Sequence, residues 1–237
     1  MPTRDPLPRF YLGCDLGQSM DYTAIVGIEA LGKANADKQR AYKEADIRVV
    51  LCERGQESYK KVGERLKQLV EGPHLGTPCY EDTIIDRLAL RDEKTLPPRL
   101  AVDATGVGRG VVDHLRSYGL DFKAVQLTGG LKEHRDGGYH NVPKKDLISL
   151  AVVGFQNGWI KIAEGLPHRE QLEHELLNYR TKVNLRTGHE SFEAWRERDH
   201  DDIVLALSLA IWCASKARTD WRRRVLVGTF DRFPGLA

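Results

Sequence analysis

The first run of mostly apolar residues, at 10–16, predicts a buried β-strand. Two further runs rich in β-branched residues follow at 22–31 and 47–53, and the charged segment 32–45 predicts a solvated loop between them. Successive strands with short connections usually pair antiparallel, so we expect a three-stranded meander. Residues 1–9 are polar and proline-rich, and we expect a flexible arm there.

After Ser58 the apolar residues recur at helical spacing, which predicts a helix that ends before Gly72 and Pro73. The following residues, to about position 98, are interrupted by prolines and predict at most a short helix at 81–90.

The pattern then predicts a strand, a helix and a second strand, at 100–104, 109–118 and 122–127. This order is a βαβ unit, so we expect parallel pairing in this half of the sheet. Residues 128–142 are bounded by two Gly-Gly pairs and predict a mobile loop or a hairpin. A helix at 144–157, a short extended segment at 159–162 and a second helix at 167–178 should follow.

The C-terminal part predicts a pair of strands at 179–184 and 191–195, followed by a helix that is apolar on nearly all sides. Such a helix should be buried. We therefore expect an α/β fold, with an antiparallel meander followed by parallel strands in one mixed sheet flanked by helices. The expected division is an arm at 1–9, one domain at 10–217 and a basic tail at 218–237, which ends in a disordered stretch containing glycine and proline.

Composition narrows the class of protein. The chain has 237 residues, of which 41% are hydrophobic and 30% charged, as in ordinary globular domains. Its net charge is only +2, so any basic face must arise from uneven distribution. The four cysteines show no zinc-ligand spacing or disulfide framework, which favours a reducing cytoplasm. The N-terminus does not resemble a signal peptide, and no apolar run is long enough to span a membrane.

Lone carboxylates occupy three places in this pattern. Asp15 lies within the first strand, on the same face as Gly13, and Asp103 lies near the end of a later strand. Asp201 and Asp202 begin the apolar helix. A buried carboxylate is costly unless it is paired or binds a metal. If these acids converge, their oxygens suit Mg²⁺ or Mn²⁺, which prefer carboxylates and water.

Each acid also has a purely structural interpretation. Asp15 could cap a turn, and Asp103 could mark the entry to the next helix. Asp201 and Asp202 could serve as the N-cap and first-turn acids that a helix dipole favours.

Four segments in this order resemble the nuclease domain of phage terminase large subunits, a branch of the RNase H-like (retroviral integrase) superfamily. They are GCDLGQSMDYTAIVGI, LAVDATGVGRGVVDHL, VPKKDLI and HDDIVLALSLAIW, and they span residues 10–215. The resemblance implies an RNase H-like fold and a two-metal mechanism of phosphodiester cleavage. It also implies that Asp15 bridges both Mg²⁺ or Mn²⁺ ions, Asp103 and Asp202 bind one ion each, Asp201 lies beside them, and Asp21 is an accessory ligand.

The same resemblance makes double-stranded DNA the substrate, cut with little sequence specificity during viral genome packaging in the host cytoplasm. Lys144, Lys145 and Arg135 are the candidate DNA contacts. A packaging ATPase, a small terminase subunit and a portal are the implied partners. The sequence contains no GxxxxGK[ST] phosphate loop, so we do not expect this chain to translocate DNA by itself.

Other functions remain open from the sequence alone. A Holliday-junction resolvase has the same fold and also closes its site with acids on a final helix. The Asp-Leu-Gly opening is similar to that of sugar-kinase and actin-like ATPases, although this chain looks too short for their two halves. A non-catalytic DNA-binding or assembly module that retains the fold is the third alternative.

Overall fold

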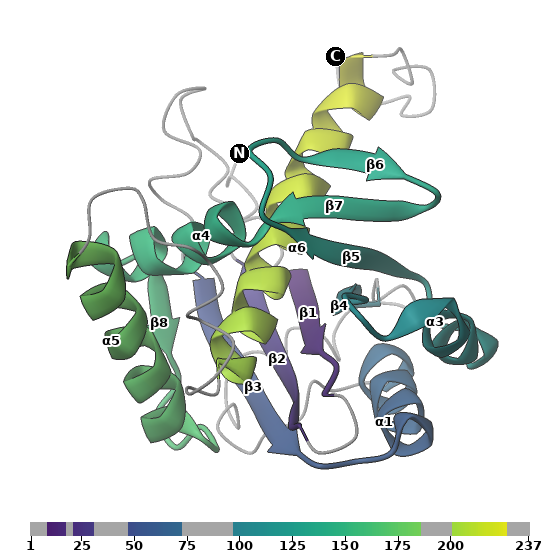
Figure 1. The fold of residues 1–237 in the computed structure, drawn as a ribbon, viewed down its shortest axis with the longest axis horizontal. Coiled ribbons are helices and arrows are strands. Elements are labelled where there is room, and N and C mark those ends of the chain that lie inside the picture. Colours follow the sequence, from purple (N-terminus) through teal and green to yellow (C-terminus); the bar gives the residue numbers. More distant parts are fainter. Residues whose placement is uncertain (1–8, 18–20, 31–46, 73–96, 186–200, 227–237) are drawn as a thin grey trace, which may run out of the picture.

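The computed structural model describes residues 9–17, 21–30, 47–72, 97–185 and 201–226. It contains a mixed sheet of eight strands in the order β6-β7-β5-β4-β1-β2-β3-β8 (Figure 1). The strands are β1 (Arg9–Asp15), β2 (Thr23–Ala30), β3 (Ile47–Gly55), β4 (Arg99–Asp103), β5 (Phe122–Thr128), β6 (His134–Asp136), β7 (Tyr139–Pro143) and β8 (Ile160–Ile162).

Strand pairing confirms the predicted fold class. β1, β2 and β3 form an antiparallel meander, while β4 pairs parallel to β1 and β5 pairs parallel to β4. This is the RNase H-like arrangement expected from the sequence. The predicted loop at 128–142 contains a hairpin, because β6 pairs antiparallel with β7 and β7 continues the sheet beside β5.

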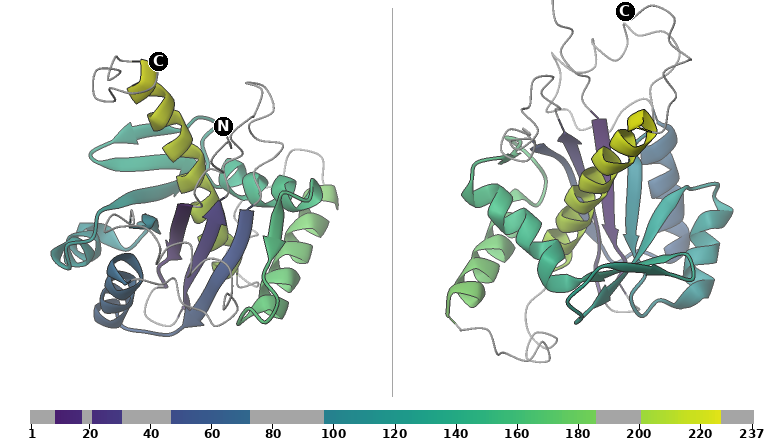
Figure 2. Two further views of the ribbon diagram at one scale, coloured as in Figure 1. Left: turned by 180° about the vertical axis from the view of Figure 1, so that it is seen from behind. Right: turned by 90° about the horizontal axis from the view of Figure 1, so that it is seen from above.

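Helices cover both faces of the sheet (Figures 1 and 2). One face packs against α1 (Tyr59–Glu71) and α3 (Gly108–Ser117), and the other against α4 (Lys144–Gln156), α5 (Arg169–Leu185) and α6 (Asp202–Leu226). The side chains of β1 alternate as predicted. Tyr11 belongs to the core beneath α6, whereas Leu12, Cys14 and Leu16 belong to the core beneath α1 and α3.

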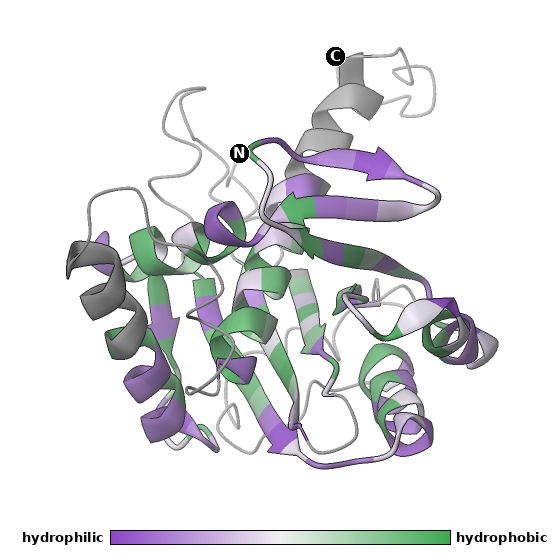
Figure 3. Cartoon of the chain, viewed as in Figure 1, coloured by the Kyte–Doolittle hydropathy of each residue, from purple (hydrophilic) through white to green (hydrophobic). Residues whose placement is uncertain are grey.

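Helix α6 crosses the sheet over β1, β2 and β4 (Figure 1). It is largely hydrophobic where it crosses, in contrast to the hydrophilic strand β6 (Figure 3). Gly13 makes this close packing possible, because a Cβ atom there would lie 1.9 Å from the backbone oxygen of Ala206 and 2.6 Å from the backbone nitrogen of Ala210. The missing side chain at position 13 therefore fixes the height of α6 above β1.

One sequence prediction about the C-terminal part is wrong. Residues 179–184 are helical, because α5 continues to Leu185. Thr181 and Val183 favoured a strand, but no glycine or proline interrupts the helix before position 188. Helix α6 extends to Leu226 and so includes the first residues of the expected basic tail.

Several other predictions fall outside the described residues: those for 1–8, 32–45, 81–90, 191–195 and 227–237. Cys14, Cys52 and Cys213 are buried, as expected of core cysteines. Within the described part of the chain, no helix combines the length and apolar character that crossing a membrane requires.

Candidate active site

Two of the predicted acids lie side by side at one edge of the sheet. β1 and β4 are parallel neighbours in which Cys14 is opposite Val102, so Asp15 and Asp103 follow at the adjacent strand ends. Both carboxylates belong to the face that α6 covers, because residues two positions earlier, Gly13 and Ala101, lie under that helix. Parallel pairing thus brings together two residues far apart in the sequence.

Asp201 and Asp202 lie at the same edge, at the start of α6. Both carboxylates form ion pairs with basic side chains. Asp202 Oδ2 accepts hydrogen bonds from Arg54 Nε at 3.1 Å and Nη2 at 2.9 Å. Lys144 Nζ donates to Asp201 Oδ2 at 2.8 Å. The backbone carbonyl of Asp201 also accepts a hydrogen bond from the Leu205 N–H at 2.9 Å, which places Asp201 at the N-cap position of α6.

A buried acceptor for the first turn of α6 comes from Glu175 on α5, which the sequence analysis did not identify. Its Oε2 accepts hydrogen bonds from the backbone N–H groups of Ile203 at 3.1 Å and Val204 at 3.0 Å. The side chain is buried, and Oε1 has no hydrogen-bond partner within the described residues. Burial raises the pKa of Glu175 to about 7, against the backbone hydrogen bond from Val204, which lowers it.

Asp103 is held by the turn that follows its strand. The backbone N–H of Thr105 donates to Asp103 Oδ1 at 2.7 Å, and Thr105 Oγ1 accepts from the backbone N–H of Leu127 at 2.8 Å. Helix α3 begins only at Gly108, with Val107 at the N-cap position, so Asp103 does not cap it. The carboxylate is therefore oriented by a local Asp-x-Thr turn.

The pKa values of Asp15 and Asp103 are raised. The pKa of Asp15 lies well above its usual value because of burial first, and then because of the negative charges of Asp103, Asp202 and Asp201. Burial is also the main cause that raises the pKa of Asp103 to about 6, and Lys144 lowers the pKa of both residues. A cluster of this kind is unfavourable in its fully ionised form unless further positive charge is added.

The chemistry of these donors fits a hard divalent cation, because the candidate ligands are carboxylate oxygens. Within the described segments, no three histidine, cysteine, aspartate or glutamate side chains are arranged to hold a metal ion as they stand. Asp202 and Asp201 face Arg54 and Lys144 instead. Binding of an ion by all of these acids would therefore require side-chain rotation at the start of α6.

The remaining predicted site residues lie further toward solvent. Asp21 is exposed in the turn before β2, Lys145 is exposed in the first turn of α4, and Arg135 is exposed on β6. None of the three is among the charges that act most strongly on Asp15 and Asp103. Lys144, by contrast, lies within the acidic cluster.

The β6–β7 hairpin is attached to α6 next to a group of positive charges. Trp212 Nε1 donates to Glu133 Oε2 at 3.3 Å, and the ring of His140 meets the Trp212 ring edge-on at 5.2 Å. The pKa of His140 is lowered by burial and by the charges of Lys123 and Arg135. The surroundings of His140 are therefore electropositive.

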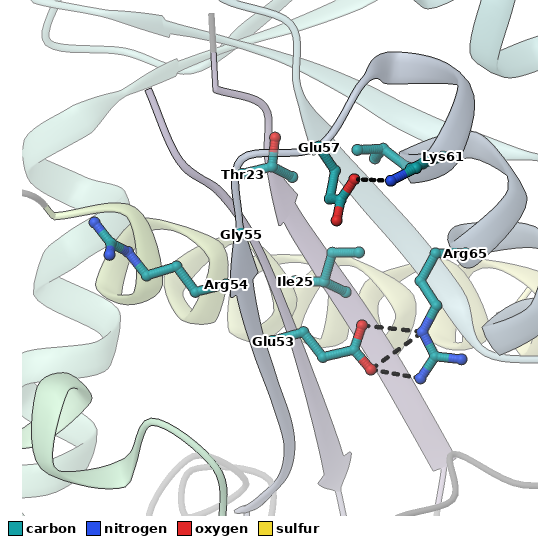
Figure 4. A pocket seen from close by; sticks show the side chains of 9 residues that line it. Thr23, Ile25, Glu53, Arg54, Gly55, Glu57, Lys61 and Arg65 are labelled. Atoms are coloured by element: carbon teal, nitrogen blue, oxygen red, sulfur yellow. Dashed lines mark hydrogen bonds and ion pairs between the residues drawn. The ribbon is translucent and has the colours of Figure 1, made fainter. Parts of the chain in front are cut away.

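A separate pocket of about 330 Å³ lies on the other face of the sheet, between β2, β3 and α1 (Figure 4). Glu53 forms an ion pair with Arg65 there, and Lys61 pairs with Glu57 at 2.9 Å. Arg54 points away from this group in Figure 4, toward the acids. The side chains of Glu53 and Arg54, which are consecutive on β3, thus lie on opposite faces of the sheet.

Comparison with solved structures gives two similar nuclease domains. One is the large terminase nuclease from thermophilic phage G20c, with a TM-score of 0.46 and 19% identity, covering 86% of this chain and 81% of that chain. The other is the human cytomegalovirus terminase nuclease domain in a manganese-soaked structure, with a TM-score of 0.47 and 12% identity, covering 86% and 83%. In structure, the chain is similar to terminase nuclease domains. No family model and no curated protein matches it.

Proposed function

We propose that this chain is a metal-dependent DNA endonuclease of the terminase type. The observation that carries the proposal is the convergence of Asp15, Asp103, Asp201 and Asp202, whose charges act on one another at one edge of the sheet. A fold that needed these acids only for stability would gain nothing from placing like charges together.

In the proposed site, Asp15 would be shared between two Mg²⁺ or Mn²⁺ ions, and Asp103 and Asp202 would each hold one of them. Asp201 is an additional ligand, and Asp21 contributes from the rim. Two bound ions supply activation of a water molecule and stabilisation of the leaving oxygen in phosphodiester hydrolysis. Thr105 supports this arrangement by orienting the Asp103 carboxylate through its backbone N–H.

Lysine and arginine side chains around this edge are proposed to bind the DNA backbone. Lys144 is closest to the acids, Lys145 follows it on α4, and Arg135 extends from the hairpin. Charges of this kind contact phosphates and position a duplex without reading its bases. We therefore propose cleavage of double-stranded DNA with little sequence specificity.

The biological setting we propose is viral genome packaging, with concatemeric DNA as the substrate in the host cytoplasm. A packaging ATPase, a small terminase subunit and a portal are the proposed partners. The support for this setting is the order and the residues of the four sequence segments, which resemble those of terminase large subunits.

A supercoiled-plasmid assay tests the proposed activity. We expect nicked and linear products with Mg²⁺ or Mn²⁺ and none with a chelator, because the acids act through bound ions. An Asp103→Asn protein purified in parallel excludes a contaminating nuclease if it does not cut. Retention of DNA without cleavage in either ion would contradict the proposal and favour a non-catalytic DNA-binding module.

A further inference from the structure

The start of α6 determines where Asp201 and Asp202 lie, and it is capped in an unusual way. The first N–H groups of a helix have no partner within the helix. In α1 the cap is local, because Ser58 accepts from the backbone N–H of Lys61. In α6 the corresponding acceptor is Glu175, a buried carboxylate on a different helix.

A second side chain on the same face of α5 contacts the guanidinium group of Arg54. Gln171 lies one turn before Glu175 and, with its amide oriented to accept, receives hydrogen bonds from Arg54 Nε at 3.3 Å and Nη1 at 3.2 Å. Arg54 in turn binds Asp202. Helix α5 therefore contacts both the backbone that carries Asp202 and the side chain that holds its carboxylate.

We propose that Glu175 is a positioning residue that fixes the first turn of α6, so that Asp201 and Asp202 are held at the same edge of the sheet as Asp15 and Asp103. It acts through its two hydrogen bonds to the backbone and is not itself a metal ligand. This inference rests on the proposed function, since the ions concerned are those of the proposed nuclease site. Loss of a group that orients metal ligands typically weakens metal affinity by about 10–100-fold.

Calorimetric titration with Mn²⁺ alone, without DNA, compares three replacements with the parent. Glu175→Gln keeps an acceptor oxygen at the same reach, so we expect it to retain the parent affinity. Glu175→Asp keeps the charge but is one methylene shorter, and Glu175→Ala has no acceptor, so both should bind Mn²⁺ about 10–100-fold more weakly. The proposal would be overturned if Glu175→Asp bound Mn²⁺ with the parent affinity and Glu175→Gln bound it more weakly. Parent affinity in all three variants would overturn it as well.

The matched control is Glu170→Gln, which removes a carboxylate from an exposed position of the same helix and should leave Mn²⁺ affinity unchanged.

Amide hydrogen exchange provides a second measurement that needs neither metal nor cleavage. The Ile203 and Val204 amides should exchange slowly in the parent and in Glu175→Gln, and faster in Glu175→Asp, while Leu207 stays slow in each. Failure of the parent to bind Mn²⁺ would count against the proposed function, whereas unchanged exchange in Glu175→Asp would count against the cap.

Discussion

Replacement of Asp15 by asparagine is expected to reduce metal-dependent DNA cleavage by about 100–1,000-fold. The bound ions of such sites contribute several kcal/mol to transition-state stabilisation, and about 1.4 kcal/mol corresponds to a factor of ten in rate. Asp15 is the proposed bridge between the ions, so its loss should affect both. Initial rates of plasmid nicking with Mn²⁺ measure the change.

The same replacement should have the opposite effect on the stability of the metal-free protein. The pKa of Asp15 is raised in the folded state, so the penalty on folding grows as the pH rises from the usual aspartate pKa to the raised value and is complete above it. Metal-free Asp15→Asn should therefore unfold at a higher temperature than the parent at pH 8. This advantage should shrink as the pH falls through the raised pKa, since the parent carboxyl is then protonated.

The control for both effects is Asp121→Asn, an exposed aspartate just before β5. It removes one negative charge without touching the cluster, so cleavage and metal-free stability should remain close to those of the parent. A fully active Asp15→Asn protein would contradict the metal assignment, and a metal-free protein less stable than the parent would contradict the electrostatic account.

Substitution of Gly13 by alanine should be strongly destabilising, by about 3 kcal/mol or more in the free energy of unfolding. Overpacking of a core typically costs about 1–3 kcal/mol. Here the added Cβ would meet backbone atoms of Ala206 and Ala210, which cannot rotate away as a side chain can. The helix must shift as a body, and because Asp202 moves with it, cleavage should fall as well. Urea denaturation measures the loss of stability.

Gly110→Ala on α3 is the matched control for this substitution. An added Cβ at Gly110 has no neighbouring atom within 4 Å, and alanine is favoured over glycine in a helix by about 1 kcal/mol. This variant should therefore be as stable as the parent or more so. Equal stabilities of Gly13→Ala and the parent would show that α6 can rest higher on the sheet than the structure indicates.

Much of the fold was predictable because it depends on local periodicity. Alternation in β1 separated Tyr11 from Leu12 correctly, and the βαβ order around Asp103 predicted the parallel half of the sheet. The prediction failed where local preference and context disagree. Thr181 suggested a strand, yet the polar segment around it continues α5.

The candidate site was predictable only in part, for a similar reason. Asp15, Asp103 and Asp202 are unusual in apolar surroundings, so each stands out in the sequence. Glu175 does not, because it lies in a charged helix whose polar residues look solvated, and only the packing of α5 against α6 buries it. Arg54 is similar, since its contact with Asp202 depends on the register of β3.

One signal near the site could have been used. An aspartate followed two residues later by a threonine, as at Asp103 and Thr105, is typical of a turn in which the carboxylate accepts the second backbone N–H. That turn would have identified Asp103 as a fixed side chain at a strand end, and the hydrogen bond from the Thr105 N–H is present.

Anomalous diffraction from crystals soaked in Mn²⁺ tests most directly whether separate acids share ions in this protein. The account predicts two manganese peaks about 3.5–4 Å apart, with Asp15 touching both and the carboxylates of Asp103 and Asp202 each touching one. Manganese found only elsewhere, with Asp202 still bound to Arg54 and Asp201 still bound to Lys144, would contradict it.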